Sequence, residues 1–473
     1  MKFDYMFNPR SVAVVGVSSG ALNPATIIFL NNLISFGYKG KVYPINPTVE
    51  EVAGMKTYPT ILDVPGPVDH VISGVKASMV PELLKQCIAK GVSTLHLYTA
   101  GFAETGDEER CDLQQEIVAM AKNSGVRILG PNCMGIYSPK AGLSFCPDFP
   151  KDVGKVGFIS QSGSYSLLVV RGASARGVRF SKMVSYGNAC DIDECDLLEY
   201  LGNDPETEII AAYIEGTRDG LRLRKVLTEA ASKKPVIIIK KGHTEAGKRG
   251  ASSHTGAMAG DDETWDAVIR QAGAVRVDDF EELIDVLTTF QFFKLPKSRK
   301  TVVICIGGGP SVRSADDCER AGLILHHIPD DMVQELRKTA PVAGSMLRNP
   351  VDVGAYHVEW SRVIDVLAAW PECDMFLWQI APDIEPFPDE GIFRQWCLDR
   401  RAIFIENFVK SGKPIAVTVH MVERKEAMDI LHVTRELCIK HGVPFYSSVY
   451  SAAKAIVKYI DYHQHRAYGR GVY

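Results

Sequence analysis

Residues 155–166 read KVGFISQSGSYS, an apolar run that passes directly into four serines and a glycine. Apolar residues bounded by turn residues predict a short buried strand, and the serine–glycine loop is typical of the N-terminus of a helix. Similar apolar runs alternate with amphipathic stretches along almost the whole chain. This alternation predicts an α/β fold with parallel sheets, because parallel strands need crossover helices between them.

The expected strands fall into three series. The first contains residues 11–15, 41–45, 70–75, 94–98 and 126–129, with amphipathic helices over 81–90 and 108–122 between them. The second contains 155–159, 209–214 and 236–240, and the third 301–306, 375–378 and 414–419. Because a chain of 473 residues is too long for one core, we expect one domain per series, over residues 1–140, 150–294 and 301–473.

The second and third series open alike. The spacing in one is repeated in the other, with Ile159, Gly163, Ser166 and Gly177 matching Ile304, Gly308, Ser311 and Gly322. This agreement fits either a duplicated fold or independent use of a common strand–loop–helix unit.

Composition excludes several classes of function. A net charge of −4 gives no electrostatic basis for binding nucleic acid or an anionic membrane. No apolar run is long enough to span a bilayer, and the first residues lack the apolar core of a signal peptide. The eleven cysteines show neither CxxC spacing nor metal-ligand clusters, which predicts reduced thiols, no structural metal and a cytoplasmic protein.

Two loops of the first series predict a site for a nucleotide-like ligand. Gly16, Ser18 and Ser19 follow the first strand, where a glycine–serine turn at a helix start offers N–H groups to a phosphate. Asn46 and Pro47 follow the second strand, where a dinucleotide-binding domain usually has an acidic residue for the ribose. The missing acid and the missing GxGxxG pattern argue against NAD; an empty crevice is the alternative.

Two further loops end strands of the same series and are expected to converge with the first. They contain Gly101, Phe102, Asn132 and Cys133. Ligands of open α/β sheets bind at the carboxyl ends of the strands, so these residues are candidates for the same site. Cys133 is either a polarisable neighbour for a thiol or a small buried filler.

The loop after residue 159 predicts a phosphate site. Ser160, Gln161, Ser162, Gly163 and Ser164 bring hydroxyl and backbone donors to the positive end of a helix dipole. The alternative is an ordinary serine N-cap, which needs only one of these residues. A serine-hydrolase elbow does not fit, because glycine is absent two residues before the serine.

His254 is the candidate phosphoryl carrier. It lies in the run SSHTGAMAG, residues 252–260, on a glycine-rich stretch after the strand over 236–240. Small residues and glycines let such a loop move and wrap around an anion, although a solvent-exposed loop histidine is the alternative. His243 lacks small residues on both sides. Glu215, at the end of another strand, is expected to orient the His254 imidazole or to cap the next helix.

These motifs together resemble the NDP-forming acyl-CoA synthetases, the superfamily of succinyl-CoA synthetase. The likeness is closest to the α subunit of the ADP-forming acetyl-CoA synthetases. It covers essentially the whole chain and rests on residues 11–16, 43–47, 100–102, 130–133, 160–163, 213–216, 253–256 and 349–352.

The resemblance implies a Rossmann-like CoA-binding domain followed by two flavodoxin-like ligase domains. It also implies a reversible reaction in which acyl-CoA and phosphate give an acyl phosphate and free coenzyme A. His254 then takes the phosphoryl group, steadied by Glu215, and carries it to ADP. Residues 160–164 match the helix start that holds its phosphate.

Nothing in the chain resembles the ATP-grasp domain with which the family binds ADP or ATP and Mg²⁺. The resemblance therefore implies a separate α subunit that forms a hetero-oligomer with an ATP-grasp β subunit. A non-catalytic CoA-binding module of the same fold is the main alternative, and a nicotinamide-dependent oxidoreductase is a weaker one. The acyl group is left open. Phe102, Tyr165 and Tyr186 are the candidates to line its pocket, and Met134 departs from the aliphatic residue usual at its position.

Overall fold

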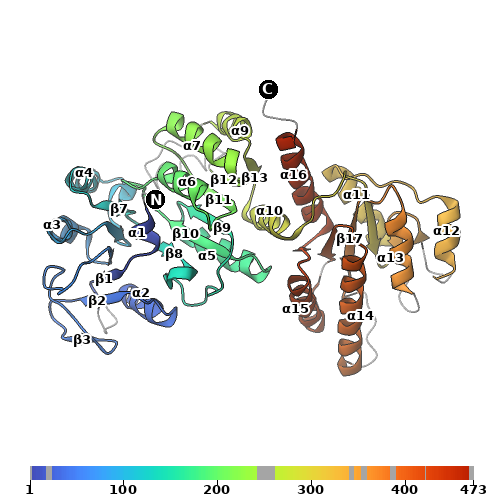
Figure 1. The fold of residues 1–473 in the computed structure, drawn as a ribbon, viewed down its shortest axis with the longest axis horizontal. Coiled ribbons are helices and arrows are strands. Elements are labelled where there is room, and N and C mark those ends of the chain that lie inside the picture. The colour runs from blue at the N-terminus through green and yellow to red at the C-terminus, as the bar shows by residue number, and fades with distance from the viewer. Residues whose placement is uncertain are drawn as a thin grey trace. The chain divides into compact units, whose positions relative to one another are not determined.

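The computed structural model describes residues 3–17, 24–241, 261–339, 346–352, 359–383, 390–420 and 422–467. The chain forms two compact units, residues 1–283 and 284–472, each of layered α/β construction (Figure 1). Two parallel sheets lie in the first unit and one lies in the second. The α/β fold with parallel sheets expected from the alternating pattern is confirmed.

The first sheet has five parallel strands in the order β2-β1-β5-β6-β7. All residues of β1 are buried, because helices cover both faces of the sheet. The elements of this part are α1 (Asp4–Phe7), β1 (Ser11–Val15), α2 (Pro24–Ser35), β2 (Lys41–Ile45), β3 (Glu51–Val52), β4 (Met55–Lys56), β5 (His70–Ser73), α3 (Val80–Lys90), β6 (Thr94–Leu97), α4 (Glu108–Lys122) and β7 (Arg127–Leu129).

The second sheet has six strands in the order β13-β12-β11-β9-β10-β8, and only β8 runs antiparallel to its neighbour. Its elements are β8 (Gly135–Tyr137), β9 (Val156–Ser160), α5 (Gly163–Ala175), β10 (Phe180–Ser185), α6 (Glu194–Asn203), β11 (Ile209–Ile214), α7 (Gly220–Lys233), β12 (Val236–Lys240), α9 (Asp262–Gln271), β13 (Val275–Val277) and α10 (Phe280–Phe292).

Strand β8 pairs with a strand of the following series. It comes from the segment expected to end the first domain, yet it pairs with β10 as the edge of the second sheet. A strand of three residues is too short to give a periodic pattern, so no sequence signal indicated it. Its pairing joins the end of the first series directly to the second sheet.

The third sheet, in the second unit, has the order β15-β16-β14-β17-β18-β19. Its elements are β14 (Thr301–Cys305), α11 (Gly308–Ala321), α12 (Asp330–Arg337), β15 (Met346–Leu347), β16 (Val351–Asp352), α13 (Trp360–Ala369), β17 (Met375–Ile380), α14 (Glu390–Lys410), β18 (Ile415–Val419), α15 (Lys425–Lys440), β19 (Phe445–Tyr446) and α16 (Val449–Ala467).

All three sheets place the first parallel strand of their series between the second and the third. In a doubly wound sheet of this order, the ligand crevice lies at the carboxyl ends of the strands beside the first one. The second and third sheets also share an antiparallel edge strand next to their second parallel strand. The likeness seen in their opening motifs thus extends over the whole sheet, which favours a duplicated fold.

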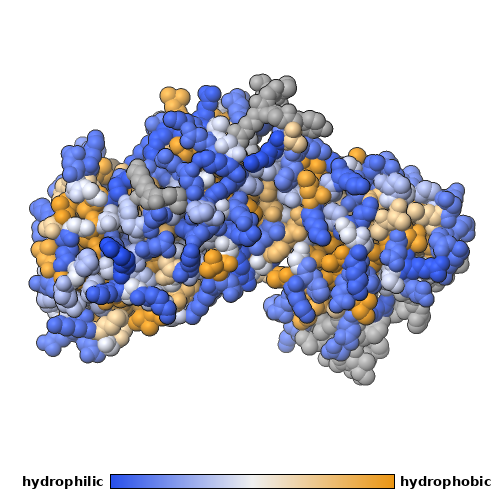
Figure 2. Space-filling view, in the orientation of Figure 1, coloured by the Kyte–Doolittle hydropathy of each residue, from blue (hydrophilic) through white to orange (hydrophobic). Residues whose placement is uncertain are grey.

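Among the described residues, no helix is long and apolar enough to cross a membrane. Hydrophilic residues predominate on the face drawn in Figure 2, with smaller hydrophobic patches between them. The ten cysteines that the structure describes are all free, and nine of them are buried.

Two histidines are buried in the first sheet. His70 on β5 and His96 on β6 stack with ring centroids 6.1 Å apart. The His96 Nε2 donates to the Cys133 carbonyl oxygen over 3.2 Å, whereas His70 Nδ1 has no hydrogen-bond partner within the described part of the chain. Burial lowers the pKa of His96 to about 4, and burial together with the neighbouring His96 lowers the pKa of His70 to about 3. Both rings are therefore neutral at physiological pH.

Acid is expected to destabilise the first sheet through these histidines. The pKa of a histidine in an unfolded chain is about 6.5. As the pH falls, the unfolded state therefore binds protons that the folded state does not bind. The stabilising contribution of neutral His70 is complete above that pH and is lost toward its folded pKa of about 3. As the pH falls from about 6 to 4, the free energy of local unfolding should decrease more steeply for wild type than for His70→Leu. The difference between the two slopes should be about 1.4 kcal/mol per pH unit.

Hydrogen exchange of the β5 and β6 amides, corrected for intrinsic rates at each pH, measures this difference locally. Such a local measurement suits a chain of several domains, which need not unfold in one step. Parallel pH profiles for wild type and His70→Leu would show that the histidine is not responsible.

Candidate active site

A cavity of about 510 Å³ opens at the carboxyl ends of the strands in the first unit. A volume of this size is typical of small-molecule sites. Four loops contribute to it, and the lining residues are Gly74, Val75, Lys76, Tyr98, Thr99, Ala100, Asn132, Cys133, Met134, Gln161, Ser162, Gly163 and Ser164. Loops of the first sheet and the serine loop of the second therefore meet at one site.

The serine loop begins helix α5. Ser162 is the N-cap, and its Oγ accepts from the Tyr165 N–H over 3.4 Å, while the Ser164 Oγ lies 3.2 Å from it. Ser162, Gly163 and Ser164 line the cavity at the positive end of the helix dipole, where an anion is stabilised. A Cβ on Gly163 would lie 2.7 Å from Met134 Cγ, so glycine lets the two loops approach closely.

Ser160 and Gln161 hold the loop in place. Ser160 is fully buried outside the cavity lining, and its hydroxyl donates to the Ser162 carbonyl oxygen over 2.8 Å. The Gln161 Oε1 accepts from the backbone N–H groups of Glu215 and Gly216. Gln161 also lines the cavity, so it connects the N-terminus of α5, the expected phosphate site, to the end of β11.

The loop carrying Asn132 and Cys133 forms the facing wall. Asn132 has a left-handed backbone, with φ of 58°. Cys133 is buried, its Sγ donates to the Leu97 carbonyl oxygen over 3.8 Å, and burial raises the pKa of the thiol. A protonated, buried thiol is a poor nucleophile, although Cys133 does line the cavity.

The remaining described candidates of the first sheet are not among the residues that line the cavity. Asn46 is buried, with Nδ2 donating to the Val17 carbonyl oxygen and Oδ1 accepting from Thr48 over 2.8 Å, so it shapes its own loop. Gly16 has a φ of 85°, Pro47 is exposed, and the Gly101 N–H donates to Glu104 over 2.6 Å. Ser18 and Ser19 lie outside the described residues.

Three expected pocket residues are placed elsewhere. The side chains of Phe102 and Tyr186 are completely buried, and Tyr165 stacks on Phe280 with ring centroids 3.8 Å apart. None of them lines the cavity. Phe102 and Tyr186 pack inside the protein, and Tyr165 packs on another ring. Lys76 and Tyr98, which were not expected, line the cavity instead.

Glu215 follows β11 at the same sheet edge. It is 9% exposed, and its Oε1 accepts from the Tyr213 hydroxyl over 3.0 Å. The helix that follows it, α7, is capped by Asp219, whose side chain accepts from the Arg222 N–H. This finding removes the alternative that Glu215 is a helix cap.

His254 and His243 lie outside the described residues. The segment that carries them leaves the sheet at the carboxyl end of β12, where Lys240 pairs with Ile214, the residue before Glu215. It is followed by α9, on which Trp265 lies 5.2 Å from the Lys240 ammonium. The described end of the segment at Lys240 therefore lies beside the strand end that carries Glu215.

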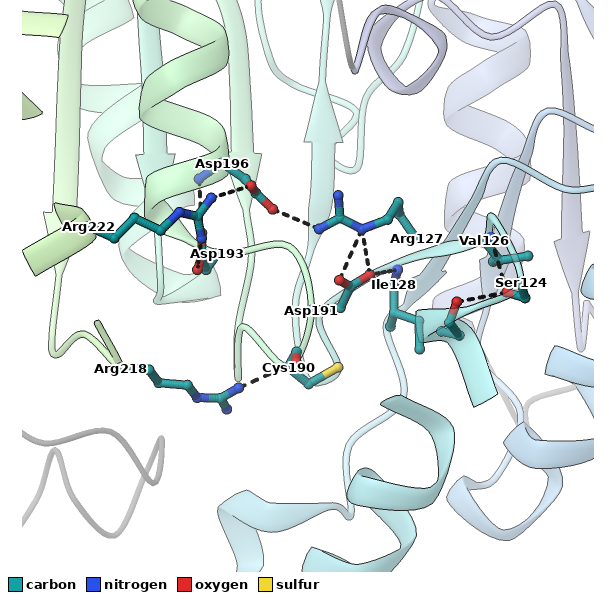
Figure 3. A network of polar contacts seen from close by, with 11 residues as sticks. Ser124, Val126, Arg127, Ile128, Cys190, Asp191, Asp193, Asp196, Arg218 and Arg222 are labelled. Atoms are coloured by element: carbon teal, nitrogen blue, oxygen red, sulfur yellow. Dashed lines mark hydrogen bonds and ion pairs between the residues drawn. The ribbon is translucent and has the colours of Figure 1, made fainter. Parts of the chain in front are cut away.

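A polar network connects the two sheets of the first unit (Figure 3). Arg127 on β7 pairs with Asp191 over 2.9 Å and with Asp196 over 2.7 Å. Arg222 on α7 pairs with Asp193 over 2.8 Å and also with Asp196. These partners are 26 to 69 residues apart in the sequence, so no local pattern indicated them.

The segment held by this network supports the cavity wall. The Asn188 N–H donates to the Pro131 carbonyl oxygen and the Cys190 N–H to the Gly130 carbonyl oxygen, each over 3.0 Å. Gly187, with φ of 55°, lies so close to Pro131 that a Cβ would be 2.3 Å from the carbonyl oxygen. The loop that leads into Asn132 is therefore fixed by the second sheet as well as by the first.

Two known families match the chain, one over each of the two sheets whose loops line the cavity. Residues 10–139 match the family described as CoA binding domain. Residues 153–290 match the family described as succinyl-CoA ligase like flavodoxin domain.

Proteins similar over the full length are known. The chain is 35% identical over 465 residues to the α subunit of acetate–CoA ligase [ADP-forming] II of Pyrococcus furiosus, covering 96% of this chain and 97% of the relative. It is 37% identical over 354 residues to 4-hydroxybutyrate–CoA ligase [ADP-forming] of Nitrosopumilus maritimus, which covers 74% of this chain but 50% of that longer relative.

A solved structure is similar in fold. It is the dinucleotide forming acetyl-coenzyme A synthetase 1 of Ca. Korarchaeum cryptofilum in complex with phosphate and ADP. The TM-score is 0.82 at 30% identity, and the match covers 99% of this chain and 98% of the other.

Proposed function

The chain belongs to the family of the ADP-forming acyl-CoA synthetases, and on this premise we propose that it converts acyl-CoA, phosphate and ADP reversibly into acid, coenzyme A and ATP. The observation that carries this proposal is the meeting of two loops at one cavity. The loop of Asn132, in the region that matches CoA-binding domains, faces the N-terminus of α5. A thioester and a phosphate ion are thereby brought next to each other.

In the first step, a phosphate oxygen bonds to the thioester carbonyl carbon. The carbon–sulfur bond breaks, and coenzyme A leaves as the thiolate. Ser162, Ser164 and the free N–H groups of α5 hold the phosphate through fixed dipoles, which stabilise charge without reorganisation during the reaction. The acyl phosphate then occupies the same end of the helix.

In the second step, one ring nitrogen of His254 bonds to phosphorus while the bond to the acyl oxygen breaks. The acid leaves as a carboxylate and a phosphohistidine remains. Glu215 accepts a hydrogen bond from the N–H of the other ring nitrogen, which fixes the tautomer and makes the attacking nitrogen more nucleophilic. The described start of the His254 segment at Lys240, next to the end of β11, supports this pairing.

The last step takes the phosphoryl group to ADP. We assign the ADP and Mg²⁺ site to an ATP-grasp β subunit, so that the active enzyme is a hetero-oligomer. Two relatives named as α subunits support this, because the chain covers 97% and 96% of their lengths. The free, buried thiols agree with a reducing compartment, the cytoplasm.

A single-turnover assay tests the proposal. The chain alone, mixed with phosphate and an acyl-CoA of a panel, is expected to release about one equivalent of CoA thiol, because the phosphohistidine cannot be discharged. Continued release requires ADP and the ATP-grasp subunit. Calorimetry should detect coenzyme A but not ADP on the chain alone.

Three outcomes contradict the proposal. Thiol release that does not depend on phosphate would mean simple hydrolysis, and a clear ADP signal would place the nucleotide site on this chain. The absence of thiol release both alone and with the reconstituted subunit would favour a CoA-binding module without catalysis.

A further inference from the structure

The hydroxyl of Tyr213 makes a contact that the proposed chemistry has not yet used. Tyr213 lies on β11, two residues before Glu215, so both side chains point to the same side of the extended chain. The Tyr213 O–H donates to the Glu215 Oε1 over 3.0 Å in a buried setting. A hydrogen bond to an ionised acceptor is stronger than one between neutral groups, particularly away from water.

The ring of Tyr213 is itself held in place. Its centroid lies 5.3 Å from the ring of Tyr165, in the first turn of α5, and 5.3 Å from the ring of Phe280, at the start of α10. Tyr165 and Phe280 stack on each other at 3.8 Å. Tyr213 is 4% exposed, so its ring has little freedom to move.

The hydroxyl also stays protonated. Burial, together with the negative charge of Glu215, raises the pKa of Tyr213 above its ordinary value. It is therefore a permanent donor to the carboxylate at physiological pH. Gln161 makes a different contact, because its Oε1 accepts from the backbone N–H groups of Glu215 and Gly216.

We propose that Tyr213 is a positioning residue for phosphoryl transfer, which fixes the rotamer of the Glu215 carboxylate so that it meets the His254 imidazole in one orientation. This inference rests on the proposed function. A carboxylate that rotates freely presents the imidazole with the correct geometry only part of the time. Loss of a supporting hydrogen bond of this kind typically costs about 10- to 100-fold.

Tyr213→Phe removes the hydroxyl and keeps the ring that packs between Tyr165 and Phe280. The matched control is Tyr200→Phe, since the Tyr200 hydroxyl donates to the Asp4 carboxylate over the same 3.0 Å elsewhere in the first unit. Two half-reactions are measured for each protein, namely phosphate-dependent release of CoA thiol and phosphorylation of the chain by acyl phosphate. Thermal unfolding is followed in parallel.

In Tyr213→Phe, phosphorylation of the chain is expected to slow about 10- to 100-fold while initial thiol release stays within about twofold. Tyr200→Phe should leave both half-reactions unchanged. Adding Tyr213→Phe to Glu215→Ala should cost nothing further, because alanine leaves no side chain for the hydroxyl to position.

A Tyr213→Phe protein that is phosphorylated at the wild-type rate would overturn the inference. So would an equal loss in both half-reactions, or a further loss in the double variant. A wild-type protein that takes no phosphoryl group at all is a distinct outcome, because it removes the proposed function itself.

Discussion

Replacing His254 by asparagine is expected to stop phosphoryl transfer completely while coenzyme A still binds with nearly wild-type affinity. The amide of asparagine is similar in size to part of the imidazole but has no nucleophilic nitrogen. Removing the residue that forms a covalent intermediate typically lowers the rate by about four orders of magnitude or more. The loops that we propose to bind coenzyme A lie on the first sheet, in the region that matches CoA-binding domains, and contain none of the altered atoms.

His243→Asn is the matched control, because it changes a histidine eleven positions earlier in the same segment. It should support turnover with the ATP-grasp subunit at a rate within about threefold of wild type. The prediction is checked by the rate of ATP formation and by calorimetry with coenzyme A. Sustained turnover by His254→Asn would exclude His254 as the phosphoryl carrier. Loss of turnover in His243→Asn would instead indicate that His243 is the carrier.

Replacing Glu215 by glutamine is expected to slow phosphorylation of the chain by about two to four orders of magnitude without unfolding it. Glutamine has nearly the same shape, and its Oε1 can still accept from the Tyr213 hydroxyl. It lacks the negative charge that holds one imidazole tautomer and stabilises the cationic ring formed during transfer. A comparable exchange of a histidine-orienting carboxylate costs about 10⁴-fold in serine proteases.

Stopped-flow mixing with acyl phosphate and unfolding of the variant check this expectation together. Glu282→Gln is the control for a buried glutamate of the first unit outside the cavity lining, and it should change stability but not phosphorylation. If Glu215→Gln is phosphorylated as fast as wild type, Glu215 has only a structural role.

The local patterns of the sequence predicted most of the fold. Strands such as 11–15, 209–214 and 236–240 have the expected bounds, because strands buried on both faces are continuous apolar runs between turn residues. Strand β8 escaped notice because three residues in an antiparallel edge have no period to detect. The common order of the three sheets depends on pairings between distant strands, which no local pattern encodes.

The candidate site shows the same limit. The convergence of the Asn132 loop with the loop over 99–102 was predicted from one general fact, that carboxyl ends of parallel strands of one sheet lie at one edge. The meeting of the Asn132 loop with the serine loop was not predicted in this way, because the two loops belong to different sheets. The hydrogen-bond partners of the individual residues in these loops were not predictable. Ser160 turns inward, Asn46 binds its own loop, and Gln161 connects to Glu215, because each hydrogen bond depends on partners brought together only by folding.

The contact of Tyr213 with Glu215 was only partly predictable from the sequence. Alternation along a strand places residues two apart on one side, so the pair was visible in the run over 213–216. Whether the hydroxyl reaches the carboxylate is decided by Tyr165 and Phe280, from two helices distant in sequence. Supporting residues of this kind require a structure.

Mass spectrometry of the chain after incubation with acyl-CoA and phosphate tests the central claim most directly. Digestion at neutral to alkaline pH preserves the acid-labile bond of phosphohistidine. We expect one phosphoryl group, on the peptide that contains His254, which disappears when ADP and the ATP-grasp subunit are added. A chain that stays unmodified even with that subunit and ATP, or that carries the phosphoryl group on another residue, would contradict the account.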